Sequence, residues 1–151
     1  MSSLFFSQIF ICLLVLSVAL QFWLGWRHIF HIQAHRHQVP PRFAEQIALT
    51  AHQKAADYTC AKTRIGLIGL LIQSLLLFGF TIGGGLQALH QFWTGHTSGF
   101  VYGIALIFSV LAISSLVDLP FSIYRQFVIE ARFGFNRMTF GLFIGDLGKQ
   151  I

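Results

Sequence analysis

The sequence has few charged residues. Its 151 residues include only 10 Lys and Arg and 5 Asp and Glu, while 55% of the chain is hydrophobic and the mean hydropathy is +0.69. A typical soluble domain is about one-quarter charged. This chain cannot cover a water-facing surface with polar groups. The composition therefore excludes an ordinary soluble domain and predicts an integral membrane protein.

Catalytic motifs are also absent. Cys12 falls in an apolar stretch and Cys60 in a basic loop, so we expect neither a disulfide nor a cysteine zinc site. The sequence contains no H-E-x-x-H zinc motif, no phosphate-binding P-loop and no serine-hydrolase elbow. We therefore predict no catalytic residue, no metal ligand and no cofactor in this chain.

Among the residue types that can bind a metal ion or haem, histidine is the one that clusters in this sequence. His28, His31 and His35 would share one face of a helix, and His37 follows them. Such a cluster could hold a metal ion, and histidines facing each other across spans could ligate haem. We favour a polar interfacial segment, because no Asp, Glu or Cys accompanies the cluster and no His lies in the middle of a span.

Three long apolar stretches are present, over about 4–26, 65–93 and 99–124. A helix needs ~20 apolar residues to cross a bilayer core. We therefore predict an all-α integral membrane helical bundle with three spans, in which Gly83 to Gly85 could kink the long second stretch or let its helix fray early. The first stretch lacks the basic start of a signal peptide, so we expect it to be a retained anchor.

Basic residues mark one side of this three-span arrangement. All ten fall within 27–64 or after residue 124, and the connection over 94–98 carries no Lys, Arg, Asp or Glu. The positive-inside rule places the basic loops in the cytoplasm and the N-terminus outside. We expect a multi-pass protein of a bacterial inner membrane. Its net charge of +5 is explained by basic loops that set the membrane topology and contact anionic lipid headgroups. We therefore expect no nucleic-acid partner.

The first basic loop contains a further helix. Val39 to Pro41 should break any helix that leaves the first span. Residues 42–64 lack Gly and Pro and carry apolar side chains at spacings of three and four, which is typical of an amphipathic helix. We expect this cytoplasmic helix to lead directly into the second span.

The third stretch ends in a patterned segment. Pro120 should kink its helix, and Gly134 should end it in a left-handed cap. Phe133 and Phe135 flank that glycine and should pin the turn. Asn136 should then cap a partial helix over 137–151. Nothing in the chain is obviously assigned to cover the apolar face of that helix, so we expect the sequence to be the front part of a longer protein.

Two carboxylates in this segment are candidates for function. Asp118 lies inside a span, where a charge is costly unless it is paired or wet. It could serve a functional site, be solvated at the interface, or pair with Arg125. Glu130 could pair with Arg137, with Arg132, or with an Arg or Lys of the helix over 42–64. Arg132 suits it less, because positions two apart diverge on a helix.

Three blocks together carry a family resemblance: "HQKAADYTCAKTRIG" (52–66), "DLPFSIYRQFVIEARFGFNRMTF" (118–140) and "DLGK" (146–149). They are similar to the N-terminal membrane region of the CAAX prenyl proteases, membrane zinc metalloendopeptidases that carry H-E-x-x-H. The positions that match the family pattern are Lys54, Ala55, Tyr58, Lys62, Leu119, Pro120, Tyr124, Phe127, Ile129, Glu130, Phe133, Gly134, Phe135, Asn136, Thr139, Asp146 and Lys149.

The resemblance implies a role without chemistry of its own. The family's zinc ligands lie beyond the matching region, so zinc is expected in the full-length enzyme and not here. The family's spans enclose an intramembrane chamber. The residues that would face the chamber or the substrate are Asp118, Glu130, Asn136 and Arg137, and those that would shape the fold are Pro120, Phe133, Gly134, Phe135 and Thr139.

The implied partners are the lipid bilayer, the missing C-terminal catalytic part and a peptide or prenylated-peptide substrate. The alternative is a non-catalytic membrane scaffold or interaction protein that uses the same helices alone. A metal or haem protein built on the histidine cluster is a third class.

Overall fold

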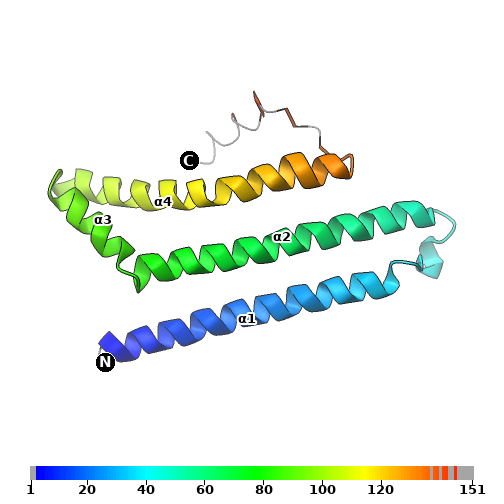
Figure 1. Ribbon diagram of the computed structural model, residues 1–151, viewed down its shortest axis with the longest axis horizontal. Coiled ribbons are helices and arrows are strands. Elements are labelled where there is room, and N and C mark those ends of the chain that lie inside the picture. Colours follow the sequence, from blue (N-terminus) through cyan, green and yellow to red (C-terminus); the bar gives the residue numbers. More distant parts are fainter. Residues whose placement is uncertain (1–2, 137, 140, 143–144, 146–151) are drawn as a thin grey trace.

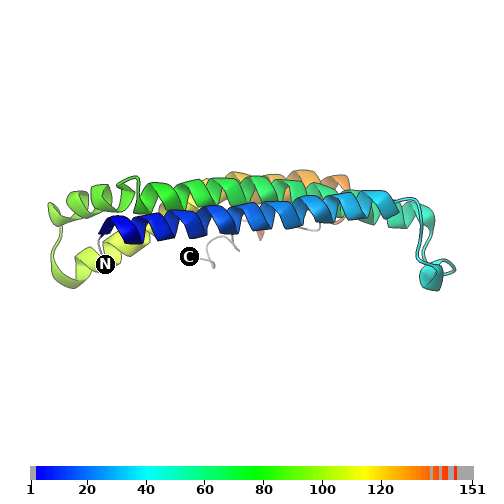
Figure 2. The ribbon, with the colours of Figure 1, turned by 90° about the horizontal axis from the view of Figure 1, so that it is seen from below.

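A computed structural model describes residues 3–136, 138–139, 141–142 and 145. These residues form helices and connecting turns, without a β-strand. Three long helices, α1 (Ser3–His35), α2 (Leu49–Thr81) and α4 (Gly99–Ile123), lie side by side with α2 in the middle (Figure 1). The view from below shows that they form one thin layer (Figure 2). The predicted all-α membrane bundle is confirmed.

The long helices expose apolar side chains as lipid-facing helices do. The segments Leu4–His35, Leu49–Thr81 and Gly99–Glu130 are each long and apolar enough to cross a membrane. Among the described residues, the buried apolar side chains are Ile29, Ala56, Cys60 and Ile129. Because lipid tails replace water around such helices, contact between helices depends on close packing rather than on burial from water.

A glycine brings α1 and α2 together. A Cβ atom added to Gly25 would lie 2.8 Å from a terminal methyl group of Leu67 on α2. The two helices therefore meet where α1 has no side chain, as small residues permit in membrane bundles.

The stretch over 65–93, expected as one span, is divided. Helix α2 ends at Thr81, and a separate helix, α3 (Gly85–Thr94), crosses to α4 (Figure 1). Gly84 has φ of 79°, a conformation that a glycine adopts without strain. Two side-chain hydrogen bonds fix α3 on α4: Trp93 Nε1 to Ser109 Oγ at 2.9 Å, and the 2.7 Å contact between His90 Nδ1 and Tyr102 Oη.

The basic loop also differs from the expectation. Helix α1 continues to His35, well past the predicted end of the first span. Residues Pro41–Phe43 form a single 3-10 turn, η1, and α2 begins at Leu49 rather than near residue 42. Two consecutive prolines favour a tight turn here because neither can donate a helical hydrogen bond. From Leu49 onward the helix runs unbroken into the apolar stretch, as predicted.

The segments that connect the helices lie at two opposite ends of the layer. The start of α1 and the connection between α3 and α4 lie at one end (Figure 1). The loop between α1 and α2 and the turn that follows α4 lie at the other, where the basic loops are found.

Candidate functional site at the junction of α2 and α4

The chain beyond α4 changes its helical geometry. Pro120 lies inside α4 and cannot donate a backbone hydrogen bond. Residues Tyr124–Glu130 continue the helix as a π-helical segment, η2, with wider i to i+5 hydrogen bonding. Such segments occur often at functional sites. Ile129 of η2 is 5% exposed, so it is the most buried apolar side chain described.

Gly134 ends this helix as predicted. Its φ is 73°, in the left-handed region. The Phe135 N–H donates to the Glu130 carbonyl at 2.8 Å, and the Gly134 N–H donates to the Ala131 carbonyl at 3.0 Å. These two bonds together are the Schellman motif, which requires a left-handed residue at the position of Gly134.

Asn136 closes the turn with its side chain. Its Oδ1 accepts hydrogen bonds from Gln126 Nε2 at 3.3 Å and from the Met138 N–H at 2.9 Å. The capping role predicted for Asn136 passes to Thr139, since Thr139 Oγ1 accepts from the Leu142 N–H three residues on at 3.4 Å. Most of the helix expected over 137–151, including Arg137, lies outside the described residues.

Aromatic side chains join this turn to α2. The Tyr58 ring lies edge-on to Phe133 at 5.5 Å and to Phe135 at 4.9 Å between centroids. Phe133 is partly buried, while Phe135 keeps 52% of its surface exposed. The two aromatic residues around the glycine are therefore pinned by one tyrosine from another helix.

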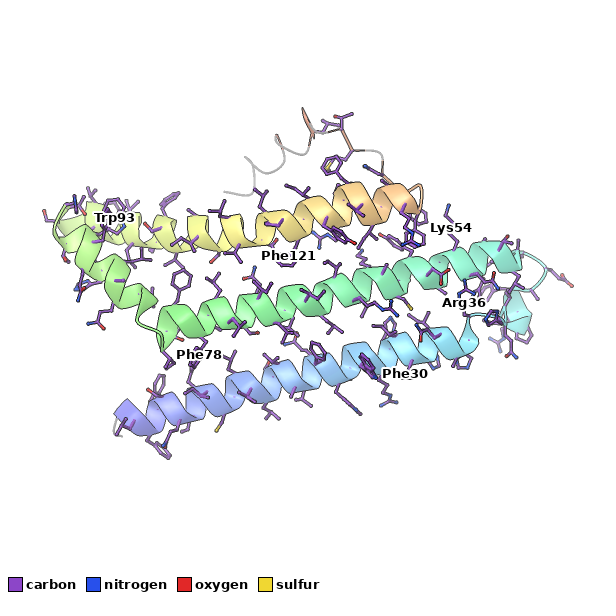
Figure 3. The ribbon with its side chains drawn as sticks, in the orientation of Figure 1. Phe30, Arg36, Lys54, Phe78, Trp93 and Phe121 are labelled. Carbon is purple, nitrogen blue, oxygen red and sulfur yellow. The ribbon has the colours of Figure 1, made fainter. Side chains whose placement is uncertain are left out.

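Two lysines of α2 lie over the aromatic rings of this contact. Lys54 Nζ lies 5.6 Å from the centre of the Phe135 ring and 3.7 Å from where a Cβ of Gly134 would stand (Figure 3). Lys62 Nζ lies 5.7 Å from the Tyr58 ring. A cation over an aromatic face is attracted by the ring quadrupole. We call the set Lys54, Tyr58, Lys62, Phe133, Gly134 and Phe135 the α2–α4 junction.

Asp118 lies on the same side of α2 but nearer the middle of the layer. Its Oδ1 accepts from Gln73 Nε2 of α2 at 3.4 Å, and its Oδ2 accepts from Ser122 Oγ at 3.4 Å. The ion pair with Arg125 does not form among the described residues. Gln73 was not predicted from the sequence, although an amide side chain inside an apolar stretch is a signal that could have indicated it.

Glu130 serves the turn through its backbone. Its carbonyl accepts from both Phe135 and Asn136, while its half-buried carboxylate makes no ion pair with any described residue. The pair with Arg132 is therefore not formed, and the Arg132 guanidinium instead lies 5.9 Å from the Phe133 ring. No Arg or Lys over 42–64 pairs with Glu130 either, and Arg137 lies outside the described residues.

One ion pair ties the loop that follows α1 to α2. Arg36 donates two hydrogen bonds to the Asp57 carboxylate, at 2.8 and 2.7 Å (Figure 3 labels Arg36). These bonds raise the pKa of the Arg36 guanidinium, so the pair stays ionised. No local spacing pattern predicts this pair, because Arg36 follows the end of α1 while Asp57 lies on α2.

The histidine cluster does not assemble a metal site in the described part of the chain, where no three His, Cys, Asp or Glu side chains are placed to hold an ion. The His31 and His35 ring centroids lie 4.3 Å apart with the rings tilted by 39°, and the Nδ1 of His35 contacts the His31 carbonyl at 2.9 Å. With His52 and the two prolines of the loop, they line a pocket of about 570 Å³.

Tyr58→Ala should separate the turn from α2. Removing a half-buried ring that touches two others should lower the free energy of unfolding by about 1–3 kcal/mol. Tyr58→Phe keeps the ring and should stay within about 0.5 kcal/mol of wild type. Tyr124→Ala, at an exposed tyrosine with no ring partner among the described residues, is the matched control. Equal loss in both alanine variants, measured by unfolding in detergent, would contradict this role.

Comparison with known proteins places these features in a family. The sequence model of the CAAX prenyl protease N-terminal region, which has five membrane helices, matches residues 28–151. A CAAX prenyl protease 1 homolog of Caenorhabditis elegans is 29% identical over 96% of this chain and 33% of its own length. CAAX prenyl protease 1 of Saccharomyces cerevisiae is 27% identical over 76% of this chain and 28% of its own length.

A solved structure agrees with the fold. The crystal structure of S. mikatae Ste24p superposes with a TM-score of 0.81 at 22% identity and covers 91% of this chain and 33% of that one. The chain thus spans about a third of the length of the relatives that it matches over most of its own length.

Proposed function

Because the chain belongs to the CAAX prenyl protease N-terminal family, we propose that it forms a wall and substrate entrance of an intramembrane chamber in a longer zinc metalloendopeptidase. Proteolysis, including the processing of CAAX-box proteins, would then be the activity of the whole protein. The chain on its own would be non-catalytic. Its partners would be the bilayer, a catalytic part and a peptide or prenylated-peptide substrate.

The observation that carries this proposal is the polar set between α2 and α4. Asp118, Gln73 and Ser122 form hydrogen bonds inside the apolar stretches of α2 and α4. A carboxylate at the centre of a lipid-facing helix costs about 3 kcal/mol. A water-filled chamber beside this seam would remove that cost, and the α2–α4 junction would hold the chamber's rim rigid.

The described residues do not fit a zinc site. Hydrolysis at zinc needs three protein ligands, an open coordination position and a base. The H-E-x-x-H motif is absent from the sequence, and no suitable group of three ligands is present among the described side chains. We therefore assign the metal and the general base to a catalytic part outside this chain.

Asp118→Asn and Glu130→Gln test the chamber role in a full-length polypeptide that carries H-E-x-x-H. Each substitution should keep the fold and lower kcat/KM for a farnesylated CAAX peptide about tenfold, which corresponds to about 1.4 kcal/mol of transition-state stabilisation. Glu45→Gln, in the exposed loop, is the control and should leave kcat/KM unchanged. If Glu130→Gln lowers stability and leaves activity intact, Glu130 is part of the scaffold only.

We also propose that the start of α1 and the α3–α4 connection face outside and that the basic loops are cytoplasmic. Cys60 is buried and would resist labelling on either side, so both native cysteines should be replaced. In sealed cells an impermeant maleimide should label Ser98→Cys, and it should label Glu45→Cys only after permeabilisation. Labelling of Glu45→Cys in sealed cells would reverse the topology. The bacterial inner membrane stays a prediction.

A further inference from the structure

The α1–α2 pair carries a groove along one side of its seam. A hollow of about 440 Å³ lies between the first half of α1 and the last part of α2. Its lining is almost wholly apolar and includes Val15, Val18, Phe22, Leu71, Leu75 and Phe78. A second hollow of about 350 Å³ continues it toward the basic loops. Phe22 lines both hollows, so they adjoin along the α1–α2 seam, and together we call them the groove.

The polarity of this groove changes along its length. Apart from Ser74, its lining on α2 is apolar from Phe78 to Leu67, and the groove ends at Arg64, Gln33 and Trp26. Arg64 is exposed, and its guanidinium makes neither an ion pair nor a hydrogen bond with the described residues. Gln33 is exposed as well, and its side-chain amide has no hydrogen bond among them. The groove therefore offers a long apolar floor with a cation and an amide at one end.

We propose that this groove binds one anionic phospholipid, with its phosphate at Arg64 and Gln33 and an acyl chain along Phe22, Leu71 and Leu75. The phosphate would receive charge-assisted hydrogen bonds from the guanidinium, whose fork geometry suits phosphate oxygens. The acyl chain would fill space that the two helices leave empty, and it would gain dispersion contacts on both sides.

The dimensions suit a lipid of a single leaflet. Helix rise places Leu75 about 16 Å along α2 from Arg64. Half of a bilayer's hydrocarbon core is about 15 Å thick. A lipid with its phosphate at Arg64 would therefore end its chain close to Leu75. Trp26 beside the cationic end is also where an interfacial tryptophan is expected.

Charge complementarity favours lipid over protein as the occupant. An apolar transmembrane helix of the same polypeptide could cover the apolar floor, but it would leave the Arg64 guanidinium beside a hydrocarbon surface. A phospholipid would cover the apolar lining with its acyl chain and pair its phosphate with the Arg64 guanidinium. A zwitterionic lipid would present a positive group near the same cation, so an anionic headgroup is favoured.

Trp26 provides the measurement. In Trp23→Phe/Trp93→Phe protein, Trp26 is the only remaining tryptophan, and its fluorescence is quenched by brominated lipid in the groove. Reconstitution into mixed vesicles should show brominated phosphatidylglycerol binding about fivefold more tightly than brominated phosphatidylcholine, because one interfacial cation favours anionic lipid by that factor. Arg64→Gln should bring this ratio close to one.

Arg27→Gln is the matched control. Arg27 lies next to the reporter in sequence and carries the same charge, but it does not line the groove. It should keep most of the preference. Ala19→Phe, which fills the apolar floor, should reduce quenching by both lipids, whereas Leu16→Phe, outside the groove lining, should not.

Equal binding of the two lipids to the reporter protein would overturn the proposal. So would an equal loss of preference in Arg64→Gln and Arg27→Gln, since the preference would then come from general surface charge. Unchanged quenching in Ala19→Phe would show that the acyl chain does not occupy the groove.

Discussion

Gly134→Val should disrupt the α2–α4 junction and lower the free energy of unfolding by about 2–4 kcal/mol. The left-handed conformation costs an ordinary residue about 1–2 kcal/mol, and a β-branched side chain resists it further. A shift out of this conformation would break the two hydrogen bonds of the Schellman motif, each worth about 1 kcal/mol. It would also move Phe133 and Phe135 away from Tyr58, and the new side chain would crowd the Lys54 ammonium.

Unfolding in detergent, followed by circular dichroism, measures this effect. Gly69→Val is the matched control, because Gly69 is helical and has open space around it. It should stay within about 1 kcal/mol of wild type. Gly134→Ala should fall between the two, because alanine adopts the left-handed conformation at a lower cost. A Gly134→Val protein as stable as Gly69→Val would contradict the described turn.

Local patterns predicted much of this fold. The three apolar stretches indicated three spanning helices because span length follows directly from bilayer thickness. Gly134 was predicted as a left-handed cap because it follows a long helix and glycine adopts that conformation without a steric penalty. The paired prolines indicated a break after the first span. In each case the determining forces act between residues close in sequence.

Contacts between helices were not predictable in the same way. The spacing of Lys54, Tyr58 and Lys62 puts them on one helix face, but it does not say which segment that face meets. Tyr58 and Phe133 belong to two of the segments that resemble the family, 52–66 and 118–140. These segments come together only when α2 and α4 pack. The hydrogen bond between Gln73 and Asp118 and the ion pair between Arg36 and Asp57 depend on the same tertiary information.

The division of the second stretch shows a different limit. Uninterrupted apolar character over 65–93 hides the end of α2, because lipid-facing helices and their connecting turns can be equally apolar. Three consecutive glycines indicated a weak point without deciding between a kink and a break. The positive φ of Gly84 and the hydrogen bonds that anchor α3 on α4 decide for a break.

Cleavage of a farnesylated CAAX peptide by this chain, with and without a catalytic part, tests the central claim most directly. The purified chain with added zinc should show no cleavage above background, because it lacks H-E-x-x-H and its described residues hold no metal-binding group. The same chain joined to a polypeptide that carries H-E-x-x-H should cleave the peptide, and a chelator should stop the reaction. Chelator-sensitive cleavage by the chain alone would contradict this account, as would full activity of the catalytic polypeptide without the chain.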